Sequence, residues 1–188
     1  MHSTRTDVPC LSGVAAQDCL TALRQIVGTD TYATAHERIA PHFRREIDTM
    51  NAVSWVPVDA FNAFVDEIAR SAGRDPEELL DEAIRQAVQR TFKTVWRMFL
   101  RVTSDEALIK RTPMIYSRGR NVGALNSRIV SPGHGELLLT GYPEASDRTL
   151  RTIGVGIRSV VELAGRREVR IAYARMSDGG RYDIRWKV

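Results

Sequence analysis

The sequence predicts an α+β fold in which a mainly helical part, residues 14–103, precedes a part made of sheet plus one helix, residues 112–188. Two observations support this fold class. Apolar residues recur at helical spacing through the first half, and short runs that alternate between apolar and polar residues fill the second. One long helical pattern separates those runs, so the second half has the order hairpin, helix, hairpin. We expect a single domain covering residues 1–188, because a chain of this length fits one hydrophobic core.

Helix-forming patterns follow one another through the first half. Each pattern places apolar residues three and four positions apart, as a helix with one buried face requires. Glycine and proline mark the ends: Gly28 and Gly73 follow predicted helices, and Pro41 and Pro76 stand at first helical positions. The predicted helices cover residues 14–27, 32–39, 41–47 and 58–72, with a longer one from Pro76 to Phe99.

The first part of the second half predicts a β-hairpin. Its strands cover residues 122–130 and 136–140, and the turn between them contains His134, which we expect to be solvated. The continuous apolar run at residues 137–139 is typical of a strand that is covered on both faces. Residues 112–117 are a candidate for one further strand.

A long helix follows the first hairpin. Ser146 is a suitable N-cap, because a serine hydroxyl can accept a hydrogen bond from an amide of the first turn. Apolar residues then recur at helical spacing from Leu150 to Ala164. Gly154 and Gly156 lie inside this pattern, where glycine weakens a helix by about 1 kcal/mol relative to alanine. We therefore expect these glycines to allow close approach to a sheet.

The final hairpin has the clearest two-faced pattern. Its first strand places Val169, Ile171 and Tyr173 on one side, and Gly179-Gly180 supplies the turn. The return strand alternates again, with Tyr182, Ile184, Trp186 and Val188 on one face and Arg181, Asp183, Arg185 and Lys187 on the other. This pattern indicates an antiparallel pair with one buried face and one charged, solvated face.

Composition excludes several classes of protein. With 43% hydrophobic and 27% charged residues, the chain resembles globular proteins and not disordered ones. No apolar run reaches the roughly 20 residues that a membrane helix needs, and the first residues lack the apolar core of a signal peptide. We therefore expect a cytoplasmic protein with no membrane partner. Cys10 and Cys19 are too few for a disulfide scaffold or a zinc site, so we expect free thiols and no metal.

Charge is distributed unevenly between the two halves. Residues 1–100 have a net charge of −3 and residues 101–188 a net charge of +7. A basic half can attract nucleic acid. However, its arginines do not form one stripe, and no aromatic residues alternate with them. Nucleic acid is therefore not a favoured partner.

Three stretches carry a resemblance to a known superfamily. They are Trp55-Val56-Pro57-Val58 with Phe61, Gly141-Tyr142-Pro143-Glu144, and Val161-Glu162-Leu163-Ala164-Gly165 with Val169-Arg170-Ile171. These stretches resemble the superfamily of the bacterial 4-vinyl reductase small-molecule-binding domain and the heme-nitric-oxide-binding domain. They look most similar to an uncharacterised paralogous family known chiefly from myxobacteria. The resemblance implies a ligand-sensing or regulatory module.

Heme enters as a candidate cofactor through this resemblance. The heme-binding branch uses a Tyr-x-Ser-x-Arg motif for the propionates and a helix histidine for the iron. Here Tyr116-Ser117-Arg118-Gly119-Arg120 keeps the tyrosine and the last arginine but has Arg118 where serine is expected. The histidine candidates are His36 and His42, which do not stand where the branch would place its ligand. The cofactor is thus not identified, and heme is not the favoured one.

The sequence favours a non-enzymatic function. It contains no nucleophile elbow, metalloprotease motif, phosphate loop or paired cysteines, so no catalytic residue is assigned. We predict a small-molecule-binding regulatory or sensory domain whose pocket lies between helices and sheet and holds an apolar or anionic ligand. The candidate ligand-binding residues are Trp55, Phe92, Trp96, Tyr116, Arg118 and Arg120. A helical stripe such as that of Phe92 and Trp96 is more often plain core. The alternatives are a homodimer or other protein-interaction module and, with less support, nucleic-acid binding.

Overall fold

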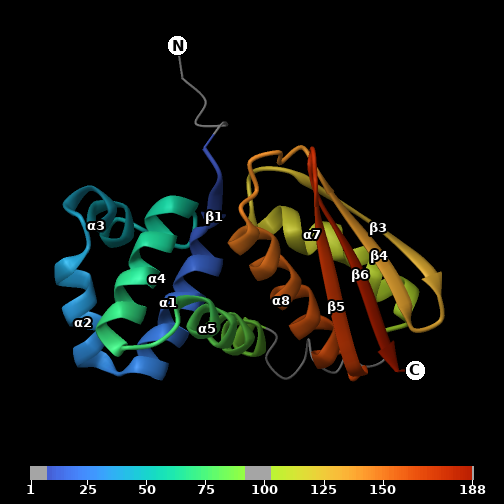
Figure 1. Cartoon of the computed structure of the whole chain (residues 1–188), viewed down its shortest axis with the longest axis horizontal. Helices are drawn as coiled ribbons and strands as arrows, with labels where there is room; N and C mark the ends of the chain where they lie inside the picture. The colour runs from blue at the N-terminus through green and yellow to red at the C-terminus, as the bar shows by residue number, and fades with distance from the viewer. Residues whose placement is uncertain (1–7, 92–102, 188) are drawn as a thin grey trace, which may run out of the picture. The chain divides into compact units, whose positions relative to one another are not determined.

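The computed structural model describes residues 8–91 and 103–187 (Figure 1). The chain forms two compact units. Residues 1–87 with 119–122 form the first, which we call the helical unit, and residues 88–118 with 123–188 form the second, the sheet unit. The α+β class predicted from the sequence is confirmed. The single domain over residues 1–188 stays a prediction.

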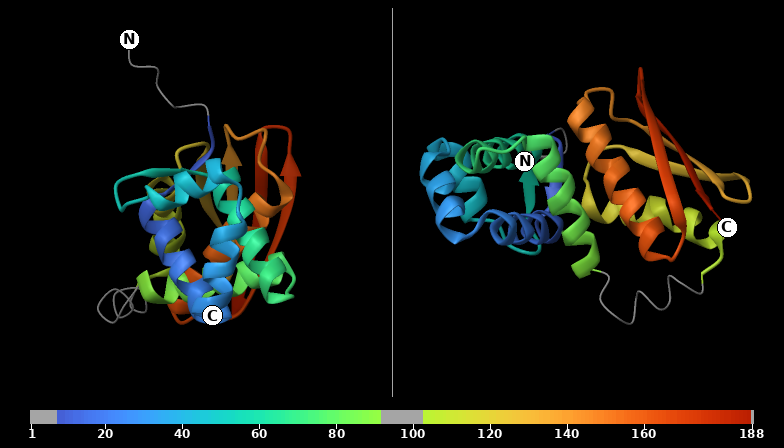
Figure 2. Two further views of the ribbon diagram at one scale, coloured as in Figure 1. Left: turned by 90° about the vertical axis from the view of Figure 1, so that its left-hand side faces the viewer. Right: turned by 60° about the horizontal axis from the view of Figure 1, so that its bottom comes forward.

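The helical unit is built around α4, which packs against α1, α2 and α3 (Figure 2). Phe64 of α4 is fully buried, and the ring of Tyr32 meets it edge-on at 5.1 Å. A two-stranded antiparallel ribbon, β1 with β2, completes the unit. The elements are β1 (Cys10–Ser12), α1 (Gly13–Val27), α2 (Thr29–Arg38), α3 (Pro41–Asp48), β2 (Trp55–Pro57) and α4 (Val58–Ala72), after which α5 (Pro76–Thr91) begins.

Local signals explain these boundaries. The hydroxyl of Ser12 accepts a hydrogen bond from the amide of Ala15 at the start of α1, and Pro41 stands in the first turn of α3. Gly73 ends α4 with φ at 62°, in the left-handed region that favours glycine. The predicted helices of the first half are confirmed, except that the end of the last one, toward Phe99, lies outside the described residues.

The last residue of α7 and the three residues after it, 119–122, belong to the helical unit. Asn121 accepts a hydrogen bond from the amide of Cys10 at 2.7 Å and donates one to the carbonyl of Val8 at 2.9 Å. Arg120 forms an isolated antiparallel bridge with Leu11. The chain therefore leaves the helical unit, enters the sheet unit, returns for residues 119–122 and leaves again.

The sheet unit contains a four-stranded antiparallel sheet in the order β3-β4-β6-β5. One face is apolar and buried: Leu137 on β4 faces Tyr182 on β6, and both side chains are fully buried. Helix α8 packs against β5 and β6 on this face (Figure 2). The elements are α7 (Asp105–Gly119), β3 (Ala124–Ser131), β4 (His134–Thr140), α8 (Asp147–Leu163), β5 (Arg167–Met176) and β6 (Gly179–Lys187).

The candidate strand over residues 112–117 is wrong, because these residues lie in α7. The hydroxyl of Ser104 accepts from the amide of Ala107 at 3.2 Å and so caps the helix. Leu108 and Tyr116, two turns apart on one face, are both buried. The helical period becomes visible only over this longer span, and Pro113 removes one hydrogen bond without ending the helix.

Two further expectations about the first hairpin are corrected. His134 does not sit in a solvated turn; it is the first residue of β4, and its side chain is 20% exposed. The run at residues 137–139 is not covered on both faces. Leu137 and Leu139 are buried, whereas Leu138 is half-buried on the other side of the sheet. Alternation of side chains along a strand explains this difference.

The two glycines of α8 have different environments. A Cβ on Gly154 would lie 3.6 Å from Ile171 and 3.7 Å from Tyr182, which is ordinary contact with the sheet. A Cβ on Gly156 would have no neighbour within 4 Å. The expected approach to the sheet is therefore seen at Gly154, and the expectation is wrong for Gly156.

Replacing Gly156 with alanine should stabilise the protein. Alanine loses less conformational entropy in a helix, so we expect Gly156→Ala to raise the free energy of unfolding by about 0.5–1 kcal/mol. Urea denaturation followed by circular dichroism measures this. Gly13→Ala is the contrast, because its Cβ would lie 1.8 Å from the carbonyl oxygen of Asn51. A loss of stability in Gly156→Ala would contradict the account of α8.

One carboxylate joins three elements of the sheet unit. Asp105, in the first turn of α7, accepts a hydrogen bond from Arg166 Nε at 2.7 Å and one from Trp186 Nε1 at 3.1 Å. Arg166 also donates to the carbonyls of Ala164 and Thr103. The side chain of Arg166 is 13% exposed and that of Asp105 26%. This cluster fixes the start of α7 to the end of α8 and to β6.

Removing the Asp105 carboxylate should destabilise the protein strongly. Asp105→Ala leaves the largely buried Arg166 charge without its counter-ion, so we expect a loss of about 2–4 kcal/mol in the free energy of unfolding. Asp147→Ala is the matched control, since Asp147 is also in the first turn of a helix and pairs with an arginine but is 82% exposed. It should cost less than about 1 kcal/mol in urea denaturation. Equal losses would contradict the role given to burial.

Candidate functional site

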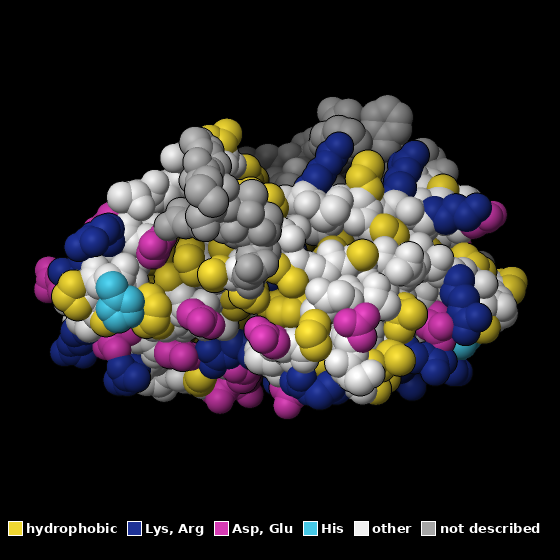
Figure 3. Space-filling model, turned by 90° about the horizontal axis from the view of Figure 1, so that it is seen from above, with side chains coloured by type: hydrophobic (Ala, Val, Ile, Leu, Met, Phe, Trp, Pro, Cys, Tyr) yellow, Lys and Arg dark blue, Asp and Glu magenta, His cyan; other side chains and the backbone are white. Residues whose placement is uncertain are grey.

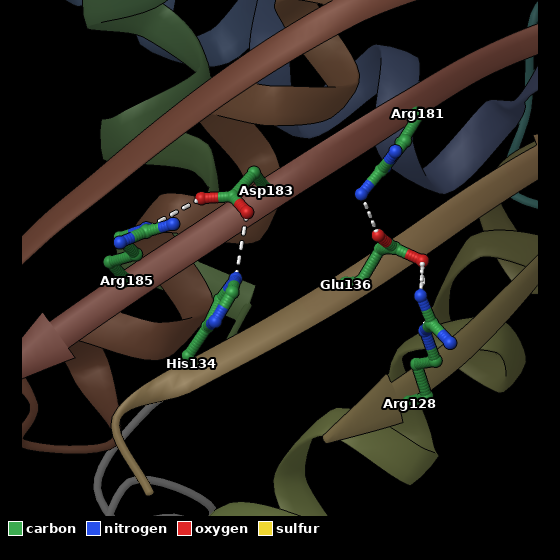
Figure 4. Close-up of polar contacts among 6 residues, drawn as sticks. All are labelled: Arg128, His134, Glu136, Arg181, Asp183 and Arg185. Carbon is green, nitrogen blue, oxygen red and sulfur yellow. Dashed lines mark hydrogen bonds and ion pairs between the residues drawn. The ribbon is translucent and has the colours of Figure 1, made fainter. Parts of the chain in front are cut away.

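The second face of the sheet carries ionisable side chains from three strands (Figure 4). Strand register brings them together: Arg128 on β3 faces Glu136 on β4, and Glu136 faces Asp183 on β6. At the start of β4, His134 faces Arg185. The alternation of β6 predicts this charged face from the sequence, whereas the partners on β3 and β4 depend on register.

Glu136 is the centre of the first network on this face. Its carboxylate lies 2.8 Å from Arg128 Nε on one side and forms an ion pair with Arg181 on the other (Figure 4). The Glu136 side chain is 14% exposed, while Arg128 and Arg181 are well exposed. The carboxylate thus holds one guanidinium from each neighbouring strand against the sheet.

Asp183 is the centre of the second network. Arg185 Nε donates to its Oδ1 at 2.9 Å, and His134 Nε2 lies within hydrogen-bond distance of its Oδ2, at 2.7 Å. The hydrogen bond from Arg185, and then the one from His134, hold the pKa of the Asp183 carboxyl below its usual value. Asp183 therefore stays ionised in more acidic solution than an ordinary aspartate does.

These networks are saturated ion pairs. Each carboxylate is matched by arginine or histidine, and no serine or cysteine nucleophile stands in the hydrogen bonds described for either network. Within the described residues, no three histidine, cysteine or acidic side chains gather as metal ligands would. The arrangement suits a charged contact surface better than general acid-base chemistry.

On the face shown in Figure 3, basic and acidic side chains are interspersed, and neither forms a continuous stripe.

The ligand-binding residues predicted from the sequence are divided between the two units and the residues outside the described ranges, so their grouping stays a prediction. Trp55 lies on β2 of the helical unit and is 44% exposed. Tyr116 is buried on α7 in the sheet unit, and Arg118 is exposed near the end of the same helix. Arg120 belongs to the helical unit. Phe92 and Trp96 lie outside the described residues.

The stretch that was compared with the Tyr-x-Ser-x-Arg motif has helical geometry. Its tyrosine, Tyr116, and the residue two positions on, Arg118, both lie in α7. Two positions correspond to about 200° around a helix, so these side chains point in nearly opposite directions. Alternate residues would share one side only on an extended strand. The side chains of Tyr116 and Arg118 therefore leave the helix in different directions, and Arg120 lies beyond the end of the helix.

Comparison with known proteins places the fold. No protein-family model matches the sequence, and no curated protein sequence does. Solved structures match over nearly the whole chain. An unliganded iron(II) H-NOX protein from K. algicida has a TM-score of 0.68 at 9% identity, over 94% of this chain and 97% of that one. The chain has the H-NOX fold.

Two other H-NOX structures agree. A mutant H-NOX from T. tengcongensis matches with a TM-score of 0.65 at 11% identity, over 94% of this chain and 98% of that chain. An oxygen-binding H-NOX domain related to soluble guanylate cyclases, in its oxygen complex, matches with 0.66 at 11% identity, over 94% and 95%. The fold that the sequence resemblance implies is thus confirmed, and membership of the superfamily stays a prediction. Membership of the myxobacterial-type paralogous family stays a prediction.

The H-NOX fold raises the question whether a histidine of this chain could coordinate a heme iron, and the environments of the described histidines bear on it. His36 Nε2 lies 2.6 Å from a carboxylate oxygen of Asp48, and the His36 ring meets Phe64. His134 is paired with Asp183 in the same way. The ring of His42 packs 4.0 Å from that of Phe43. None of these three described histidines stands in a site built to hold an iron, so they do not fit a histidine-ligated heme.

Sequence analysis missed the residues that the structure does bring together. Glu136, Asp183 and Asp105 each join two or three elements, and none was assigned a role. Their signal was present in part, because β6 alternates charged and apolar residues. The partners are 49 residues apart for His134 with Asp183 and 81 for Trp186 with Asp105. A pattern confined to one segment cannot pair them.

Arg185 should control the ionisation of Asp183. We expect Arg185→Gln to raise the pKa of the Asp183 carboxyl toward its ordinary value, because the largest stabilising hydrogen bond to the carboxylate is lost. Carbon-detected NMR during an acid titration measures this pKa. The contribution of Asp183 to stability is present above the ordinary carboxyl pKa and is lost as pH falls through the lowered one, so the variant should lose it at higher pH.

Lys187→Gln provides the control for this titration, since Lys187 pairs with Glu168 and not with Asp183. It should leave the Asp183 titration unchanged. An unaltered Asp183 pKa in Arg185→Gln would show that the two side chains are not paired in solution.

Proposed function

We propose that this chain is a non-enzymatic small-molecule-binding domain with a sensory or regulatory role. The single observation that carries the proposal is the two-way coverage of the H-NOX structures: 94% of this chain matches 95–98% of each of the three structures described above. The chain thus spans the whole of a domain type that is described as oxygen-binding in one of those structures. Fold alone does not fix function, so the ligand must be argued separately.

The structural neighbours give heme more weight than the sequence did. One of them is described by the modulation of heme redox potential through porphyrin distortion, at a TM-score of 0.68 and 12% identity. The histidines argue against heme. The chain has four, and the structure describes three of them. Two of these contact carboxylates, and the third packs on a neighbouring ring. The described histidines therefore do not support a heme whose iron is bound by histidine.

The proposed ligand is an apolar molecule that carries an anionic group, a class that includes tetrapyrroles and fatty acids. Large aromatic side chains supply contact area for an apolar body, and arginine suits a carboxylate. The candidate contacts remain Trp55, Phe92, Trp96, Tyr116, Arg118 and Arg120. Of these, Trp55 and Arg118 are already exposed to solvent. The pocket between helices and sheet stays a prediction, as does a cytoplasmic location. No described helix is long and apolar enough to cross a membrane.

An absorption spectrum and native mass spectrometry of the freshly purified protein test the proposal. A Soret band identifies heme. A colourless protein that carries a bound mass, or that takes up a fatty acid or a metal-free tetrapyrrole from a panel, supports the same proposal with a different ligand. A protein that is free of ligand and binds nothing in the panel overturns it.

A matched pair of variants tests the anion contact. Arg118→Gln should weaken binding of whichever panel compound binds, by roughly tenfold, because a charge-assisted hydrogen bond is lost. Arg111→Gln removes another exposed charge from the same helix and should leave the affinity unchanged. Equal affinity in both variants would remove Arg118 from the site.

A further inference from the structure

β3 is an edge strand of the sheet, and we propose that two copies of this chain pair through it. Within the described part of the chain, β3 is hydrogen-bonded to β4 and to no second strand (Figure 1). Alternate residues of β3 direct their amide and carbonyl groups away from β4, toward the free edge of the sheet. A further strand can bind at this edge. The strand that fits this edge is β3 of a second copy of the chain.

The register of β3 allows a symmetric pair. Pairing with β4 is regular from Ala124 to Ile129 and is broken by a bulge before Ser131. A two-fold axis perpendicular to a sheet places one residue of an edge strand opposite itself. An axis through Ser127 uses the regular stretch most fully, because residues 125–129 then all have a partner. The proposed dimer would join two four-stranded sheets into one antiparallel sheet.

Side chains on both faces are compatible in this register. On the apolar face, Leu125 of one copy lies opposite Ile129 of the second, twice per dimer. Leu125 is buried and Ile129 half-buried at the margin of the sheet. On the charged face, Asn126 lies opposite Arg128 of the second copy. No ionised side chain therefore lies directly opposite another. The two Arg128 side chains are diagonal neighbours, and each is neutralised by Glu136 of its own copy.

Arg128 does not block the edge. Charged residues on edge strands usually oppose pairing, but Nε and Nη2 of Arg128 both lie 2.8 Å from a carboxylate oxygen of Glu136 on the neighbouring strand. The charge is drawn toward β4 and away from the free edge (Figure 4). An exposed Val130, with 49% of its surface accessible, adds apolar area next to the regular stretch.

The other edge strand, β5, fits a second copy less well. Helix α8 packs against β5 (Figure 2), so pairing there would bring two copies of α8 to the same seam. Packed helices need about 8–10 Å between axes, whereas adjacent strands are about 4.8 Å apart. On the β3 side, α7 approaches the sheet at Ile109, near Gly135 of β4, and at Tyr116, near Gly123 just before β3. Within the described residues, α7 does not pack along β3 as α8 packs along β5.

Charge changes at position 126 test the register directly. Sedimentation velocity over a range of concentrations should show a weak monomer–dimer equilibrium in the full chain. Asn126→Lys places a cation opposite Arg128 of the second copy and should weaken the dimer by about threefold to tenfold, and Asn126→Glu should strengthen it by a similar factor. Ala172→Lys and Ala172→Glu make the same charge changes on the exposed surface of β5 and should have no effect.

A cysteine at the two-fold axis provides a second readout. Opposed residues in an antiparallel pair have Cα atoms about 4.5–5.5 Å apart, within the range of a disulfide. Ser127→Cys should therefore form a disulfide-linked dimer under mild oxidation, and Ala172→Cys should not. Cys10 and Cys19 are free and buried in the native chain, so the unaltered protein under the same conditions gives the background.

Three results would overturn the proposal. The first is a strict monomer at every concentration. The second is a dimer whose affinity is the same in Asn126→Lys and Asn126→Glu. The third is linkage through Ala172→Cys in place of Ser127→Cys. Because neither readout requires a ligand, failure here would leave the ligand-binding proposal standing, and the converse also holds.

Discussion

The pairing of β4 with β6 is the constraint on which the sheet unit depends. These strands are not consecutive, because α8 and β5 lie between them in the chain. Their register places Leu137 beside Tyr182 on the apolar face and His134 near Asp183 on the other. A slip of one residue would turn each side chain to the opposite face. The core and both ion-pair networks are therefore set by the same alignment.

The likeness to H-NOX structures is a likeness of fold. H-NOX structures match nearly the whole chain at 9–12% identity, so the backbone is shared while most side chains differ. His36 and His134 are both held by aspartates. A shared fold with so few identical residues does not by itself carry a function from one protein to another.

Elements with a strong local period could be predicted from the sequence. The helix over Asp147–Leu163 and the strand Gly179–Lys187 show their buried faces in any short window. The segment that contains Pro113 could not be assigned in this way, because its apolar residues are sparse and the proline conceals a helix that starts at Asp105. The charged networks could not be predicted for a different reason. Glu136 and Asp183 acquire their partners through strand register, and the sequence of a single segment does not specify register.

The return of residues 119–122 to the helical unit has a consequence for dissecting the protein. Asn121 holds Cys10 and Val8 by hydrogen bonds, although it follows α7 in the chain. The backbone therefore crosses between the units three times, at 87–88, 118–119 and 122–123. A truncated chain that stops after α5 would lack a piece of its own unit, and β1 would lose its hydrogen bonds to Asn121. Each unit is discontinuous in sequence, and neither can be excised by a single cut.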